Sequence, residues 1–391
     1  MEDQFDVSVV MSTYNRCELL PKALESVLIQ EHGEVRFEVI VVDNNSTDRT
    51  REVVESFIAR GHSNLRYIFE GRQGLSYGLN AGITSARGEI IALTDDDICV
   101  ARNWVVSIKR TFDEHPEVDF IGGKVLPVWK ASPPAWLTRQ HWAPLAITDP
   151  GDDIFYVNKR RPHCLIGKSF RRTVFEEIGL FSPELGRIKD GIGSAEDHDL
   201  QMRIWRAGGQ GMYAPDVVFT SEIDPERLTK AYHRRWHIGH GKFCAMMRII
   251  ETSGPDGELA EELPDQIKLF GVPGFLYRSL LLEIGRWLAA LVRKPENLSF
   301  ECENQVRYLI GYIRKRYEES RREERQSHTL QLMTFLRSLI HKKVAMREAY
   351  PSPSARRVDE QVFNAISSDR ATEDGLLSEI FQRPHVREPS A

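Results

Sequence analysis

Short apolar runs alternate with amphipathic stretches along the first hundred residues. The apolar runs cover residues 7–11, 37–42, 65–69 and 89–93. Between them, apolar side chains recur at helical spacing, first over residues 19–30, then from residue 46 to 59 and from 77 to 86. Near-continuous apolar strands separated by amphipathic helices are typical of a parallel sheet covered by helices on both faces. The pattern therefore predicts an α/β fold, with Ser46 and Thr47 as caps of the second helix.

Beyond residue 100, the pattern of apolar and polar residues changes twice. Further helices are expected at residues 103–112, 174–179 and 197–207, and a strand at 118–122, whereas residues 126–153 are rich in Pro and Trp and have no clear period. A loop of that length in a compact domain is usually functional. Helical spacing then dominates over residues 269–292, 303–317 and 329–345. We therefore predict an α/β domain at 5–245, a helical region at 246–350 and a loosely ordered, polar tail at 351–391.

Composition narrows the class of protein. The 391 residues include 52 Lys+Arg against 57 Asp+Glu, a net charge of -5, and 41% are hydrophobic. These values exclude a wholly disordered chain and give no electrostatic reason to expect nucleic acid as a partner. Five scattered cysteines form no CxxC pair, which argues against a disulfide framework and fits a reducing, cytoplasmic location. The acidic N-terminus does not resemble a secretory signal.

The most apolar long stretch, residues 269–292, contains Arg278, Glu283 and Arg286. Each charge near the centre of a bilayer would cost about 2.5–3.5 kcal/mol, so this segment is not expected to span a membrane. With Trp287 and flanking basic residues, it fits peripheral contact with the membrane surface. Packing on the α/β domain or on a second copy fits it equally well.

Polar side chains follow three of the predicted strands at the point where each strand ends. Thr13 and Tyr14 follow the first strand, Asp43 the second, and the triplet 95–97 (Asp-Asp-Asp) the fourth. In open parallel sheets, ligands bind beyond the carboxyl ends of the strands. No GxGxxG and no Gly-Lys-Ser/Thr follows the first strand, which argues against a dinucleotide-binding dehydrogenase and against a P-loop. The clusters still predict a binding site at this edge of the sheet.

Each cluster has a functional and a purely structural interpretation. Adjacent carboxylates repel one another, and Mg²⁺ or Mn²⁺ at Asp95, Asp96 and Asp97 would relieve that repulsion; a solvated helix-capping turn is the alternative. Asp43 could accept hydrogen bonds from a ribose or a base, or cap the next helix. Arg72 could neutralise a phosphate, or lie at the surface.

A second acidic cluster precedes the predicted helix 197–207. Glu196 and Asp197 follow the sequence Gly-Ile-Gly-Ser at 191–194, whose glycines let a loop approach a ligand closely. A carboxylate at such a place can remove a proton from an incoming hydroxyl, or simply cap the helix. Further on, His233, His237 and His240 could complete a metal site or, together with nearby arginines, bind a pyrophosphate; a basic surface helix is the alternative.

Taken together, these motifs resemble family 2 glycosyltransferases, over roughly residues 5–245. The resemblance rests on residues 7–16, 39–48, 74–82 and 88–97, and on the Glu-Asp pair at 196–197. It implies the nucleotide-sugar-binding fold called GT-A, here with an α-helical C-terminal extension. It also implies an inverting, metal-dependent transfer of a sugar from a nucleoside-diphosphate sugar, with UDP favoured, to a hydroxyl of a glycan or lipid-linked acceptor.

The resemblance assigns a role to each matching position. Thr13, Tyr14 and Asp43 would hold the nucleoside with Arg72 near the donor. The acidic triplet (Asp95, Asp96 and Asp97) occupies the DxD-type position that binds the ribose and the Mn²⁺ or Mg²⁺ on the diphosphate. Asp197, with Glu196 beside it, matches the catalytic base.

Two departures from the family pattern concern the metal and the acceptor. Residues 219–222 (Phe-Thr-Ser-Glu) stand where many relatives have a histidine, so we expect His233 to be the third metal ligand, with His237 and His240 as the other candidates. Only Arg235 and Trp236 remain of the Gln-x-x-Arg-Trp motif of processive synthases, which disfavours a processive polysaccharide synthase. Trp129, Trp136 and Trp142 of the long loop could stack on acceptor sugars, although aromatic residues more often pack a core.

Two other functions compete with a glycosyltransferase. A sugar nucleotidyltransferase would need a Gly-rich, basic loop after the first strand, and residues 11–20 do not form one. A non-catalytic nucleotide-sugar-binding protein would have no need of the base at Asp197.

Overall fold

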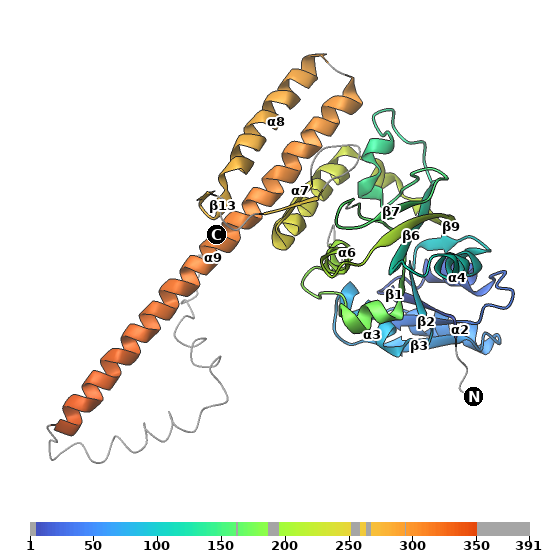
Figure 1. Cartoon of the computed structure of the whole chain (residues 1–391), viewed down its shortest axis with the longest axis horizontal. Coiled ribbons are helices and arrows are strands. Elements are labelled where there is room, and N and C mark those ends of the chain that lie inside the picture. The colour runs from blue at the N-terminus through green and yellow to red at the C-terminus, as the bar shows by residue number, and fades with distance from the viewer. Residues whose placement is uncertain are drawn as a thin grey trace, which may run out of the picture. The chain divides into compact units, whose positions relative to one another are not determined.

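The computed structural model describes residues 5–161, 163–186, 195–251, 259–262, 267–293 and 295–349. The chain divides into two compact units, Met1–Arg321 and Arg322–Ala391. The predicted tail at 351–391 and the glycine-containing approach at 191–194 lie outside the described residues. The described part of the first unit contains the main sheet (Figure 1). It also contains all the residues that line the candidate site.

The main sheet is mostly parallel in its first half and mixed in its second. Within the described residues its strand order is β3-β2-β1-β4-β8-β6-β9-β5, with β7 also paired to β9. Strands β1 to β4 are mutually parallel, and β6 is parallel to β9, whereas β8, β5 and β7 pair antiparallel with their neighbours. The strands are β1 (Val7–Thr13), β2 (Phe37–Asp43), β3 (Leu65–Phe69), β4 (Ile90–Asp95), β5 (Ile98–Val100), β6 (Phe120–Trp129), β7 (Phe155–Val157), β8 (Lys168–Arg171) and β9 (Gly211–Ile223).

Helices cover both faces of this sheet, as the alternation of apolar runs and amphipathic stretches predicts. The helices of the α/β part are α1 (Leu20–Leu28), α2 (Thr50–Ala59), α3 (Leu75–Ser85), α4 (Trp104–Glu114), α5 (Arg172–Glu177) and α6 (Glu196–Arg206), with the short 3₁₀ turns η1 (Arg139–His141), η2 (Ala143–Leu145) and η3 (Pro225–Leu228). The C-terminal helices are α7 (Lys230–Met247), α8 (Gly274–Arg293) and α9 (Glu296–Ala349). Two small hairpins, β10 (Ile249–Glu251) with β11 (Leu259–Glu261) and β12 (Lys268–Leu269) with β13 (Val272–Pro273), lie between α7 and α8 in the chain.

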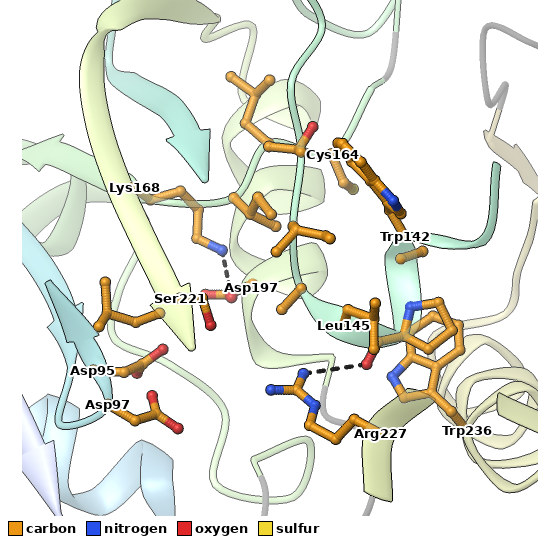
Figure 2. Close-up of a pocket in the computed structure, with 18 of the residues that line it drawn as sticks. Asp95, Asp97, Trp142, Leu145, Cys164, Lys168, Asp197, Ser221, Arg227 and Trp236 are labelled. Atoms are coloured by element: carbon orange, nitrogen blue, oxygen red, sulfur yellow. Dashed lines mark hydrogen bonds and ion pairs between the residues drawn. The ribbon is translucent and has the colours of Figure 1, made fainter. Parts of the chain in front are cut away.

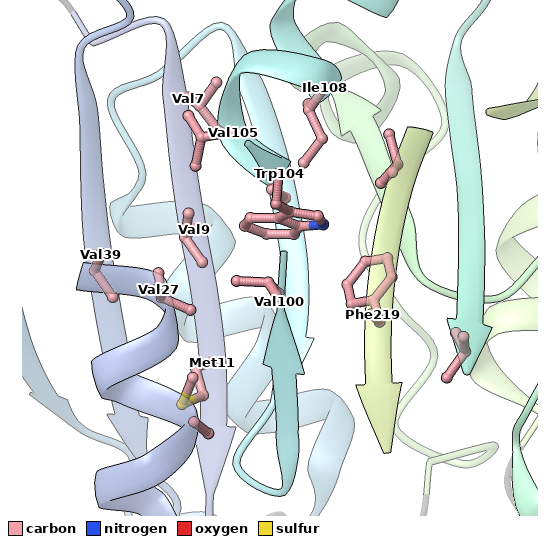
Figure 3. Close-up of a cluster of buried hydrophobic side chains, with 14 of the residues drawn as sticks. Val7, Val9, Met11, Val27, Val39, Val100, Trp104, Val105, Ile108 and Phe219 are labelled. Carbon is pink, nitrogen blue, oxygen red and sulfur yellow. The ribbon is translucent and has the colours of Figure 1, made fainter. Parts of the chain in front are cut away.

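Successive side chains of a strand point to opposite faces of the sheet, so β1 contributes to two separate cores. Val7, Val9 and Met11 pack with residues of α1, α2 and α4 on one face, while Val10 packs with residues of α3, α6, α7 and α9 on the other. Figure 3 shows the first core, where the fully buried Trp104 meets the ring of Phe219 at 5.4 Å between centroids. Burial of every residue of β1 and β2 fixes the positions of the polar groups at their ends.

The structure corrects several sequence-based expectations. Helix α2 starts at Thr50 and not at Ser46, because Ser46 and Thr47 are held in a turn by the side chains of Asp43 and Asn15. The two helices expected at 303–317 and 329–345 belong to one continuous helix, α9. The loop expected from residue 126 begins later, because β6 continues to Trp129.

Among the described residues, no helix is both long and apolar enough to cross a bilayer. All five cysteines are described, and none of them forms a disulfide, as expected.

Candidate active site

The carboxyl ends of β1, β2 and β4 meet at one edge of the sheet. Thr13 is in register with Asp43, and Ser12 with Asp95, because the three strands are parallel neighbours. A cavity of about 1670 Å³ opens at this edge. Its other walls come from the loop around η1 and η2, the end of β9, the start of α6 and one side of α7. The size is sufficient for two substrates, since ligand pockets usually measure about 300–1,000 Å³.

The acidic triplet comprises the last residue of β4 and the two-residue turn to β5, and its three carboxylates have different surroundings. Asp96 is 5% exposed; it accepts a hydrogen bond from the Thr13 hydroxyl at 2.7 Å and one from the Arg16 guanidinium at 2.9 Å. Arg16 also donates to Asp97 at 2.9 Å. Burial raises the pKa of Asp96, and the charge of Arg16 opposes that rise. All three carboxylates border the cavity, but Asp96 is buried and anchors the turn, whereas Asp95 is exposed and Asp97 is half-buried (Figure 2).

The donor set of this turn suits a hard divalent cation. Mg²⁺ is usually held by one or two carboxylates, with water and substrate phosphates completing its shell, and Asp95 and Asp97 supply two such carboxylates. Among the described residues, no group of three or more His, Cys, Asp or Glu side chains is arranged to hold a metal. The residues present thus fit an ion that depends on the substrate for the rest of its ligands.

Asp43 and Asn44 organise the neighbouring loops. One oxygen of Asp43 accepts from the Ser46 amide and the other from the Tyr67 hydroxyl, both at 2.8 Å. Burial and this hydrogen bond raise the pKa of Tyr67, which keeps it a donor. Asn44 is buried, and its side chain donates to the carbonyl of Arg72 at 2.6 Å and accepts from the amide of Gly74 at 2.8 Å.

This arrangement fixes the loop before α3. Gly74 has a φ of +142°, a conformation that strains any residue with a side chain.

Of the residues expected to hold the nucleotide sugar at this edge, Thr13 and Tyr14 line the cavity, whereas Asp43 and Arg72 do not. The Arg72 side chain instead pairs with Glu70 at 2.8 Å and lies over the Tyr77 ring.

Asp197 lies in the first turn of α6, in the wall of the cavity that also contains Lys168. These two side chains form an ion pair, drawn as a dashed line in Figure 2. The Lys168 side chain is only 4% exposed, whereas that of Asp197 is 36% exposed. One carboxylate oxygen is therefore held by a buried cation, and the group as a whole remains open to the cavity. Glu196 is buried and does not line the cavity.

The three histidines of α7 separate into two environments. His233 is fully buried against the rings of Trp136 and Phe300, outside the cavity lining, and neither of its ring nitrogens has a hydrogen-bond partner among the described residues. Burial lowers its pKa to about 4. The structure therefore does not bring His233 together with Asp96 and Asp97. His237 and His240 do line the cavity, and the His240 ring stacks on Trp236 at 4.5 Å.

Of the three tryptophans expected to stack on acceptor sugars, only Trp142 lines the cavity. Trp129 packs against the core and Trp136 is buried in the cluster with His233. Trp236 of α7 lines the cavity with Trp142, so aromatic surface is present, contributed by different elements (Figure 2).

Three cavity residues were missed as individual candidates: Arg16, Lys168 and Arg227. Arg16 follows Thr13 by three residues, a spacing that could have suggested a contact with the acidic turn. Nothing in the local sequence marks Lys168, because its partner Asp197 is 29 residues away in the chain and meets it only through the packing of α6 on β8. Arg227 stands in the Arg-Leu-Thr segment after β9, and the sequence pattern suggested no role for it.

Comparison with known proteins shows to which family the chain belongs. Residues 8–179 match the family model "Glycosyl transferase family 2". The chain is 35% identical over 242 residues to "Glycosyltransferase AglE" of Haloferax volcanii, covering 62% of this chain and 74% of that protein. The chain belongs to glycosyltransferase family 2. The expected GT-A fold agrees with the α/β sheet and its flanking helices described above.

A second relative is the "Glucosyl-dolichyl phosphate glucuronosyltransferase" of Haloferax volcanii, with 27% identity over 208 residues. That match covers 52% of this chain and 64% of the relative, so the chain spans less than two thirds of that protein. Among solved structures, a mannosyltransferase from Pyrobaculum calidifontis in complex with GDP-Man and Mn²⁺ is similar at 19% identity, with a TM-score of 0.49 over 81% of this chain and 88% of that one.

Proposed function

We propose that this protein is an inverting glycosyltransferase that transfers a sugar from a nucleoside-diphosphate sugar to a hydroxyl of a lipid-linked or polymeric acceptor. The observation that carries the proposal is the presence of two chemically different acidic groups in one cavity. The turn with Asp95 and Asp97 suits a metal-bound diphosphate, and Asp197 on another wall suits proton removal. Family membership and the name of the dolichyl phosphate relative support it.

The proposed reaction is a single displacement. Asp197 accepts the proton of the acceptor hydroxyl, whose oxygen attacks the anomeric carbon as the bond to the diphosphate breaks and its electron pair leaves with the nucleoside diphosphate. Lys168 holds one oxygen of Asp197 and so orients the other toward the cavity. Thr13 and Arg16 keep the acidic turn in place through Asp96. Mn²⁺ or Mg²⁺, bound by Asp95 and Asp97, would supply electrostatic stabilisation of the departing diphosphate.

The donor base is part of the proposal, with UDP favoured. A panel of UDP- and GDP-sugars, each with and without Mn²⁺, tests it by measuring release of the nucleoside diphosphate. We expect slow donor hydrolysis that requires the metal and falls about 10²-fold or more in Asp197→Asn while donor binding persists. Asp113→Asn, an exposed carboxylate of α4 outside the cavity, serves as the control.

The same panel separates the competing functions. Formation of a nucleotide sugar from a nucleoside triphosphate and a sugar 1-phosphate would identify a nucleotidyltransferase. Donor binding with no turnover, unchanged by Asp197→Asn, would identify a non-catalytic binding protein.

We further propose peripheral contact with a membrane on its cytoplasmic side, through α8. This helix exposes Leu281, Leu282, Leu288 and Val292, and Arg278 is exposed on the same face. An apolar helix face with basic residues suits the surface of an anionic bilayer. Flotation with vesicles of anionic phospholipid should carry the protein upward, and Leu281→Glu with Leu288→Glu should abolish that flotation. Absence of flotation for the wild type would remove the membrane interpretation.

A further inference from the structure

The cavity has walls of opposite charge. The sheet edge supplies Asp95 and Asp97, whereas the turn 158–161 and the segment η3 place Arg160, Arg161 and Arg227 on the lining. Arg160 and Arg161 are exposed at the rim. Within the described ranges no carboxylate pairs with any of these three arginines, in contrast to Arg16, which pairs with Asp96 and Asp97.

Arg227 is the innermost of the three and is held in place by neutral groups. One guanidinium nitrogen, Nη2, donates to the carbonyl of Pro144 at 3.3 Å, and the guanidinium lies 5.7 Å from the centroid of the Tyr232 ring. Its Nε is buried without a hydrogen-bond partner in the described part of the chain. Figure 2 shows the side chain projecting into the cavity, with Asp97 on one side and Trp236 on the other.

A guanidinium in this setting favours an anionic ligand. Arginine stays charged at any physiological pH, and its removal from water is unfavourable unless an opposite charge approaches. A carbonyl and an aromatic ring compensate only part of that charge. The planar fork of nitrogens matches the oxygens of a phosphate, which can accept two parallel hydrogen bonds. Two exposed arginines at the rim add attraction for a phosphate that enters from solvent.

The donor diphosphate is expected at the acidic turn, where Asp95 and Asp97 are proposed to hold the metal. Arg227 belongs to the wall formed by η2, η3 and α7, together with Trp142 and Trp236. We propose that Arg227 binds a phosphate group of the acceptor, with Arg160 and Arg161 attracting it at the rim. This proposal rests on the proposed function and names the acceptor class: a hydroxyl-bearing molecule with a phosphate near the hydroxyl that is glycosylated.

Binding measurements on the full chain test this without requiring turnover. Titration calorimetry with UDP and Mn²⁺ already bound uses two phosphate probes, geranyl phosphate and ribitol 5-phosphate, and the uncharged geranyl glucoside as a comparison. We expect binding of at least one phosphate probe to weaken about tenfold or more in Arg227→Gln, less in Arg227→Lys, and moderately in Arg160→Gln with Arg161→Gln. Arg102→Gln, an exposed arginine outside the cavity, should bind as the wild type does.

The two probes distinguish the sources of the phosphate. Preference for geranyl phosphate supports a lipid phosphate, and preference for ribitol 5-phosphate a polymer phosphodiester. Binding of geranyl glucoside as tightly as geranyl phosphate would overturn the proposal, as would binding of neither phosphate probe. Equal loss of UDP affinity in Arg227→Gln and Arg227→Lys would also overturn it, because Arg227 would then bind the donor and not the acceptor. Failure of every nucleotide to bind would instead count against the proposed function.

Discussion

The ion pair between Lys168 and Asp197 predicts an asymmetric effect on stability. Asp197→Asn removes the carboxylate and leaves the ammonium group, whose side chain is 4% exposed, without its charge partner. Removing one partner of a buried pair costs about 3–5 kcal/mol. Lys168→Met leaves a carboxylate that is 36% exposed and can be solvated from the cavity. Loss of a partner for such a group costs about 1 kcal/mol. We therefore expect Asp197→Asn to destabilise the protein more than Lys168→Met.

The double variant measures how strongly the two side chains depend on each other. With Lys168→Met and Asp197→Asn combined, neither position carries a charge, so the double variant should be more stable than Asp197→Asn alone by about 2 kcal/mol. Urea denaturation at pH 7, followed by circular dichroism without nucleotide, gives the free energy of unfolding for all four proteins. Asp113→Asn controls for loss of a surface carboxylate and should change the stability by less than about 0.5 kcal/mol.

The result also decides how the activity of Asp197→Asn is to be interpreted. A double variant that is folded yet inactive would separate the loss of the base from the loss of stability. Equal destabilisation by the two single variants, or strictly additive effects in the double variant, would refute the claim that Lys168 is a buried cation dependent on Asp197.

Three further predictions concern burial and close packing. Because burial holds the pKa of His233 at about 4, below its unfolded value of about 6.5, the unfolded state binds more protons between these values. Stability should therefore fall by about 3 kcal/mol as the pH drops from 7 to 4, and His233→Leu should remove that part of the pH dependence, as urea midpoints at both pH values will show; equal slopes would contradict it. Gly78→Ala would place a Cβ atom 2.1 Å from the Ser12 hydroxyl, so we expect a loss of about 1–3 kcal/mol in thermal unfolding, relieved by adding Ser12→Gly and not by a distant Ser→Gly change. Asn44→Ala removes the hydrogen bonds that hold the loop before α3, and should raise the KM for the donor several-fold with a smaller effect on kcat; an unchanged KM would show that this loop does not support donor binding.

Hydrophobic periodicity was sufficient to predict the α/β class and the first four strands. Apart from Ser8 and Glu38, residues 7–11 and 37–42 are apolar on both faces of the strand, a pattern expected of a sheet that is covered on both sides. The antiparallel strand β8 escaped prediction because its sequence, Lys-Ser-Phe-Arg, contains one apolar residue in four. Its hydrogen-bond partners β4 and β6 determine that it is a strand, and they are distant in the chain.

The parts of the candidate site that lie at strand ends could be predicted from the sequence. The parts that depend on how helices pack could not. The acidic triplet and the sheet edge are adjacent to strand ends, so Thr13 and Asp96 could be placed together from topology. The position of His233 could not, because a helical residue faces the site or the core according to how α7 packs. The roles assigned to Asp43 and Arg72 stay predictions, since both lie beside the cavity and not in its lining.

The proposed donor site is tested most directly by a crystal structure with UDP and Mn²⁺, with data collected at the manganese absorption edge. We expect an anomalous peak between the diphosphate and the carboxylates of Asp95 and Asp97, with Asp96 still bound to Thr13 and Arg16. An anomalous peak elsewhere in the cavity, or a diphosphate bound away from this turn, would contradict it.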